Sequence, residues 1–149
     1  MQLKKPMSPM SPMSTGMPMS MGMASGMSPD SIASKLFNMH TKAHFYHLQT
    51  TTLAQHKMLN KLYEALEEHK DSICEYLLGV QAPKRFGTLT TEAVEPFSEE
   101  CVAKFLDEGF GFTVALCDYA NAKGLEELCN LSSNLQGTFA KAKYLNTLK

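Results

Sequence analysis

The stretch HKMLNKLYEALEEHKDSICEYLLG, residues 56–79, decides the fold. Its apolar residues recur at steps of three and four, the spacing of one face of an α-helix. A capping box of Thr52 and Gln55 is expected to open this helix, and Gly79 is expected to end it. The predicted core face consists of Leu59, Leu62, Leu66, Ile73 and Leu77.

Three further amphipathic helices are predicted from the same spacing. The first begins at the cap Asp30 and ends near the sequence LQTTT; the third runs from Ser98 to about Ala122; the fourth follows Gly124. Gly109 and Gly111 lie inside the third and indicate a kink or a close helix contact. The expected core residues of the first and fourth helices are Ile32, Leu36, Met39, Ala43, Tyr46, Leu128, Leu131, Leu135, Phe139, Ala142 and Leu145.

The second and third helices are joined by a connector of about 17 residues, VQAPKRFGTLTTEAVEP. Pro83, Gly87 and Pro96 exclude one continuous helix there. The sequence therefore predicts an all-α four-helix bundle over residues 29–149, with one long connection between its second and third helices.

Size and charge narrow the class of protein. A chain of 149 residues with a net charge of -1 suits one compact domain and does not indicate a nucleic-acid or membrane binder. No apolar run reaches the roughly 18 residues that would span a bilayer.

Without any Cys-x-x-Cys pair, the cysteines are interpreted as reduced and mostly buried thiols; they are Cys74, Cys101, Cys117 and Cys129.

Residues 1–28 form a low-complexity segment of Met, Ser, Pro and Gly, predicted to be a flexible tail. Nine of the eleven methionines lie there, an enrichment that asks for a function. Thioethers bind Cu(I), press into apolar grooves, or absorb oxidants, and a plain spacer is the fourth alternative. The plain spacer keeps about half the weight; between Cu(I) binding and docking, docking on a neighbouring subunit or another protein is favoured, through a strip of Met17, Met19, Met21 and Met23.

Four residues of metal-binding type share one broad stripe of the helix over 56–79: His56, Asn60, Asp71 and Glu75. The first pair and the second are about 22 Å apart along the axis, too far for one cation. An antiparallel second copy, with a two-fold axis near Ala65 and Leu66, would bring each half to the other. Two identical sites for Fe(II), Mn or Zn are then shared between subunits.

The first helix adds three histidines at steps of four and three, His40, His44 and His47. For any one of them, an ordinary hydrogen-bonded or solvated imidazole is the simplest interpretation. The run of Glu64, Glu67 and Glu68 is interpreted as a solvated helix face.

The segment AHFYHLQTTTLAQHKMLNKLYEALEEHKDSICEYLLG resembles the ferroxidase region of the Dps proteins, the mini-ferritins of starved bacteria. The intervals of that family's ligands fall on His44, His56, Asn60, Asp71 and Glu75. YEALEEHKD is also similar, and KAKYLNTL resembles the family's C-terminal helix, with Tyr144 in place of a Trp. Asn60 replaces an anionic ligand, and Phe45 replaces a Trp beside the first His.

The resemblance implies a hollow cytoplasmic dodecamer, in a bacterium or a phage-infected cell. It would oxidise Fe(II) with peroxide or oxygen and store or detoxify the ferric product. His44 and His56 would bind iron from one subunit, Asp71 and Glu75 from its two-fold mate, and Asn60 weakly or through water.

The alternative is a catalytically silent ferritin-like assembly subunit, for example of a virion, that docks through its tail. DNA binding is not expected, because Lys4 and Lys5 are the only basic residues in the tail and such binding needs several phosphate contacts.

Overall fold

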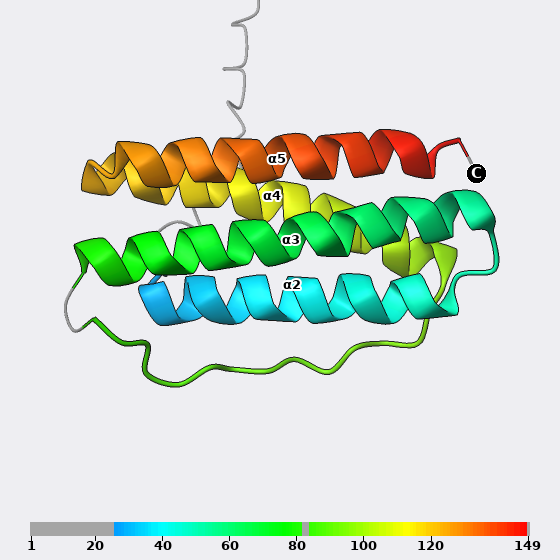
Figure 1. Ribbon diagram of the computed structural model, residues 1–149, viewed down its shortest axis with the longest axis horizontal. Helices are drawn as coiled ribbons and strands as arrows, with labels where there is room; N and C mark the ends of the chain where they lie inside the picture. The colour runs from blue at the N-terminus through cyan, green and yellow to red at the C-terminus, as the bar shows by residue number, and fades with distance from the viewer. Residues whose placement is uncertain (1–25, 82–83, 149) are drawn as a thin grey trace, which may run out of the picture.

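The computed structural model describes residues 26–81 and 84–148. These residues form four helices and no strand: α2 (Pro29–Gln49), α3 (Leu53–Val80), α4 (Glu99–Lys123) and α5 (Glu126–Asn146) (Figure 1). The expected all-α class and the four helices are therefore confirmed. The predicted Met-rich strip and its docking concern residues outside the described ranges.

The long connector sets the topology. Figure 1 shows α2 and α3 antiparallel, the connector returning along α2, and α4 then running in the direction of α3 before α5 turns back. Contacts join α2 to α3, α3 to α5 and α4 to α5 extensively, and α2 touches α4 less. The helices pack side by side around one core, with α2 and α3 presenting a common outer face.

The predicted core residues of α2 and α3 are all buried, so the sequence pattern is confirmed there. In α5, Leu128, Leu135 and Phe139 are buried, whereas Leu131 and Leu145 are half-buried at the edge. The apolar contact between the helices is the main stabilising term of such a bundle.

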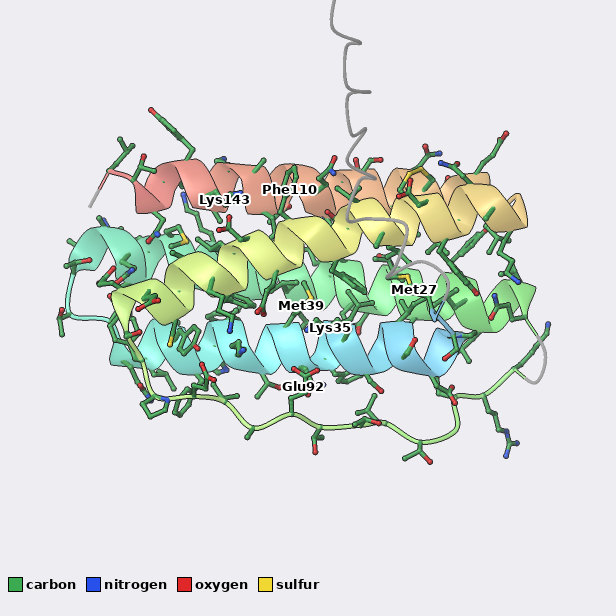
Figure 2. All side chains as sticks on the ribbon, turned by 180° about the vertical axis from the view of Figure 1, so that it is seen from behind. Met27, Lys35, Met39, Glu92, Phe110 and Lys143 are labelled. Carbon is green, nitrogen blue, oxygen red and sulfur yellow. A yellow bond between two sulfur atoms is a disulfide. The ribbon has the colours of Figure 1, made fainter. Side chains whose placement is uncertain are left out.

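Polar side chains of α2 hold the connector against it. Asn38 does so twice: its Nδ2 donates to the Thr90 carbonyl at 2.8 Å, and its Oδ1 accepts from the Glu92 amide at 3.1 Å. Ser34 Oγ accepts from the Thr90 amide at 2.9 Å. Lys35 lies beside Glu92 at 3.8 Å (Figure 2). These contacts keep the connector extended along α2 as far as the start of α4 (Figure 1).

The N-terminal cap of α2 is Ser28, so the prediction of Asp30 was wrong. Ser28 Oγ accepts from the Ser31 amide at 3.2 Å, and Ser31 Oγ accepts from the Ser28 amide at 2.8 Å. Asp30 lies within the first turn and accepts instead from the Gly87 amide at 3.0 Å, on the connector. The bundle therefore includes Ser28, which the predicted boundary had placed in the tail.

Two N-terminal truncations should differ in stability. Removing residues 1–28 deletes the cap Ser28 and the core-packed Met27, whereas removing residues 1–25 keeps both. The longer truncation is expected to be about 1 kcal/mol less stable, the usual contribution of such a cap. Thermal or urea unfolding of the two proteins side by side checks this, and equal midpoints would contradict the assignment of Ser28.

Gly79 does not end α3, which continues to Val80 and is capped by Gln81 in an extended conformation. A glycine ends a helix through a left-handed φ, and among the described residues only Gly124 has one, at 67°. Gly124 accordingly ends α4, as expected from the sequence. Gly79 has a helical conformation, which any residue adopts.

Thr52 and Ser98 cap α3 and α4 as predicted, but Gln55 does not close the expected capping box. Its buried side chain turns inward, where Nε2 donates to Glu99 Oε2 at 3.0 Å and to Asn146 Oδ1 at 3.1 Å. Gln55 thereby joins the start of α3 to the start of α4 and the end of α5. The Gln55 side chain therefore binds Glu99 and Asn146, which are distant in the chain, in place of the backbone amide of Thr52 that a capping box would use.

The two glycines of α4 have different environments. A Cβ at Gly109 would collide with the ring of Phe139, so this glycine permits the close approach of α4 and α5. A Cβ at Gly111 would meet nothing within 4 Å. The close helix contact predicted for this pair is therefore confirmed at Gly109, and Gly111 takes no part in it.

Alanine at the two glycines should shift stability in opposite directions. Gly109→Ala is expected to destabilise the fold by about 1–3 kcal/mol, because the Phe139 ring must move. Gly111→Ala is expected to stabilise it by about 0.5–1 kcal/mol, since alanine favours the helix and the position is open. Urea unfolding measures both, and a shift of the same sign in the two variants would contradict this packing.

The prediction of four reduced thiols is wrong for Cys117 and Cys129, which form a disulfide between α4 and α5. The tight turn at Gly124 brings these two positions together, a relation that the sequence spacing did not show. Cys74 and Cys101 are free; Cys74 is buried as expected, and burial raises the pKa of its thiol to about 11.

Candidate metal centre

His47 and His56 face each other across the short turn between α2 and α3. Their Nδ1 atoms lie 3.2 Å and 3.1 Å from the backbone carbonyl oxygens of His56 and His47 respectively, and the ring centroids are 4.0 Å apart. A carbonyl oxygen only accepts, so each Nδ1 donates its N–H. Both Nε2 atoms then carry the lone pair, the form in which imidazole binds a metal.

His44 lies on the same surface, 6.1 Å from His47 between ring centroids. Its ring stacks on Tyr63 of α3 at 4.4 Å, and Tyr63 also contacts the His47 ring at 5.3 Å. His44 and His56 are exposed, whereas His47 is buried between them. The structure thus brings the two predicted imidazole ligands to one open surface and adds His47 and Tyr63 beneath it.

Asn60 is half-buried one turn beyond His56, and its Nδ2 donates to Glu64 Oε1 at 2.8 Å. The donation leaves Oδ1 as the amide atom available to a cation. The Dps pattern has a carboxylate at this position. Here the Asn60 amide takes its place, and the Glu64 carboxylate accepts a hydrogen bond from that amide.

Asp71 and Glu75 are exposed near the other end of α3. The nearest cation to Asp71 is Lys70, whose Nζ lies 3.8 Å from Oδ1. Within residues 26–81 and 84–148 of one chain, no three His, Cys, Asp or Glu side chains converge on a common point. Within the described chain, these imidazole and carboxylate side chains therefore do not form one site.

Leu66, one of the two residues expected near the two-fold axis, is fully buried in the core. Ala65, the other, lines a groove between α3 and α5 with Thr138 and Lys141. The two-fold pairing itself stays a prediction. At this level of α3 the exposed side chains are Glu64, Glu67 and Glu68.

His47 was named among the histidines of the first helix but was not identified as part of the site. The signal was the short turn, residues 50–52: His47 lies four residues before its centre and His56 five residues after it, so antiparallel helices place them close to each other. The Dps intervals drew attention to His44 instead, because they specify separation along the chain and not the length of the turn.

Replacing His47 should leave the tautomer of His56 unchanged, because a backbone carbonyl fixes it. In His47→Phe the Nδ1 donor to the His56 carbonyl is lost, but the backbone carbonyl of residue 47 still accepts from Nδ1 of His56. The metal affinity should therefore escape the fall of about 10–100-fold that loss of such a supporting contact typically causes. Nitrogen-15 NMR of His56 and a Co²⁺ titration measure the two effects, with His69→Asn as the control. A mixture of His56 tautomers in His47→Phe would show that the backbone carbonyl does not fix the ring.

No protein-family model, curated protein or solved structure matches this chain. None of the helices of the described chain is long and apolar enough to cross a membrane.

Proposed function

We propose that this protein is a ferritin-like, Dps-like iron protein that oxidises Fe²⁺ at sites shared between subunits and stores the product in a hollow homo-oligomer. The observation that carries the proposal is the separation of two complementary half-sites along α3. His56 lies exposed near its start, with the exposed His44 of α2 on the same surface, and Asp71 and Glu75 lie exposed towards its other end. A two-fold, antiparallel pairing of α3 completes both sites at once.

The chain topology supports the ferritin-like assignment. One long connection between α3 and α4 leaves those two helices parallel, and the ferritin-like class of bundle has one such crossover (Figure 1). The proposal extends the observed four-helix architecture to a particular family of bundles.

Exposed apolar side chains on α2 and at the start of α3 also support a partner surface. On α2, Phe37 and Phe45 are each 38% exposed and Leu48 is 68% exposed; Leu53, the first residue of α3, is 67% exposed. Large apolar side chains left exposed on these two helices favour contact with another protein surface over contact with water. A second copy would cover them while supplying the missing ligands.

In the proposed site, Fe²⁺ is the substrate. Nε2 of His56, held by the Nδ1 contact to the His47 carbonyl, and the His44 imidazole bind it from one subunit. Asp71 and Glu75 of the other subunit supply two negative charges, which stabilise Fe³⁺ more than Fe²⁺. Two Fe²⁺ each give one electron to a peroxide, which takes up two protons and leaves as two waters.

The direct test is anaerobic loading of the apo-protein with Fe²⁺, followed by peroxide, with ferric absorbance recorded in the near ultraviolet. The intact protein is expected to oxidise iron faster than buffer, and His56→Asn and Glu75→Gln are expected to reduce the rate to that of buffer. Native mass spectrometry gives the oligomer, expected to be a dodecamer. No oxidation above buffer in an assembled protein would reject the enzymatic function.

A silent assembly subunit is the second candidate, favoured by the neutral Asn60. Its amide is engaged by Glu64, so the site lacks one anionic oxygen that the Dps pattern supplies. This candidate predicts the same oligomer without iron oxidation. The two measurements above therefore distinguish the candidates.

A further inference from the structure

A buried nitrogen of His40 has no hydrogen-bond partner. Among the described residues, His40 Nε2 is the only buried side-chain nitrogen or oxygen left in this condition. Buried polar atoms in folded proteins are almost always paired, and an exception indicates a water, an ion or a functional group that binds there.

The group that faces this nitrogen is the Glu67 carboxylate. Its Oε2 lies 3.7 Å from His40 Nε2, too far for a hydrogen bond. Two ligands of one first-row cation, with bonds near 2.1 Å, lie about 3–4 Å apart, so the gap suits a shared ion. Glu67 is largely exposed, which lets water complete the coordination.

His40 is neutral near pH 7. Burial, and next the positive charge of Lys70, lower the pKa of its imidazole, and these effects outweigh the opposing influence of Glu67. The contact is therefore not an ion pair, and a neutral ring can direct a lone pair at Glu67. The Lys70 charge is itself engaged by Asp71 at 3.8 Å and by the Phe37 ring at 4.7 Å.

We propose that His40 and Glu67 bind a divalent first-row cation, of the Zn²⁺ or Fe²⁺ class, within a single subunit. The remaining coordination positions are filled by water, because no third protein ligand converges there in the described chain. An imidazole nitrogen and a carboxylate oxygen are the donor set that such cations accept. The cation gives the orphaned nitrogen a partner and neutralises the carboxylate.

This site shares no residue with the proposed iron centre. The His44 ring is one helical turn away, with its centroid 6.4 Å from that of His40. A cation held at His40 and Glu67 therefore lies next to the imidazole half of the shared centre without using its ligands. The inference stands whether or not the protein oxidises iron.

The test uses Co²⁺ as a spectroscopic probe in the full-length protein. The parent variant carries His56→Asn and Glu75→Gln, which remove an imidazole and a carboxylate from the proposed iron centre. We expect one Co²⁺ per subunit to remain bound. Adding either His40→Asn or Glu67→Gln should weaken its binding at least tenfold, whereas adding His69→Asn should not, since His69 lies near Thr138 on α5, away from this surface.

A second measurement needs no substitution. Nitrogen-15 NMR of the unaltered protein during a Zn²⁺ titration should shift the Nε2 resonance of His40 and leave that of His69 in place. An unmoved His40 resonance, or equal Co²⁺ affinity in the parent variant and in its His40→Asn derivative, would overturn the proposal. Absence of iron oxidation in the unaltered protein, together with Co²⁺ binding that depends on His40 and Glu67, would reject the proposed function and leave this site intact.

Discussion

Mixing two inactive variants, His56→Asn and Glu75→Gln, is expected to restore about a quarter of the wild-type iron oxidation. Each variant alone is inactive because every shared site then lacks either an imidazole or a carboxylate. In a mixed dimer one site receives both damaged halves, and the other receives both intact halves. Random pairing makes about half of the dimers mixed, with one of their two sites whole.

The experiment requires the subunits to exchange, by unfolding and refolding a mixture or by co-expression with two affinity tags. The matched control mixes His56→Asn with His44→Asn. Both changes damage the imidazole half, so neither site of a mixed dimer is whole and no activity should return. Recovery in the control, or none in the first mixture despite isolated mixed dimers, would contradict the sharing of ligands between subunits.

The helices and most of the core could be predicted from the sequence, because burial of an amphipathic face imposes a period on the residues themselves. Ile32, Leu36 and Leu59 follow that period and are buried. Helix ends were less predictable, since serine and aspartate are about equally preferred at the N-cap position and the sequence offers both Ser28 and Asp30. In the structure Ser28 forms a capping box with Ser31, and Asp30 accepts instead from Gly87, which lies far away in the chain.

Contacts between helices were not predictable from spacing alone. The inward turn of Gln55 depends on Glu99 and Asn146, and the disulfide depends on the turn that brings Cys117 to Cys129. Each of these needs the relative placement of two helices, which no local pattern encodes.

The ligand types of the candidate site were proposed from the sequence and remain predictions, whereas the contacts around them could not be predicted. His56, Asp71 and Glu75 stand out by residue type and interval along one helix. The reciprocal contacts of His47 with His56 arise from the length of the turn between α2 and α3. The orphaned nitrogen of His40 requires the packing of α2 on α3 to be known. The partner half of the site remains a prediction.

Asn60→Asp is expected to have opposite effects on the apo and the iron-bound protein. In the apo protein the 2.8 Å hydrogen bond from Asn60 to Glu64 is replaced by two carboxylates one helical turn apart. Loss of the bond and the like-charge contact should together destabilise the apo fold by about 1 kcal/mol. The apo melting midpoint should therefore fall.

With Fe²⁺ present, Asn60→Asp is expected to favour the bound state of the protein instead of destabilising it. An aspartate at residue 60 offers an anionic oxygen where the asparagine offers an amide, and the bound cation relieves the repulsion from Glu64. Affinity for Fe²⁺ is expected to rise about tenfold, equivalent to about 1.4 kcal/mol. Iron should then raise the melting midpoint of Asn60→Asp by more than that of the unaltered protein.

The double variant Asn60→Asp with Glu64→Gln separates the two effects. The glutamine can donate to the new aspartate, so the apo stability should return while the gain in Fe²⁺ affinity persists. Anaerobic Fe²⁺ titration and thermal unfolding of the three proteins give all the quantities needed. If Asn60→Asp lowers apo stability but leaves Fe²⁺ affinity unchanged, residue 60 contacts Glu64 without facing the cation. The silent assembly subunit would then be the better account of the protein.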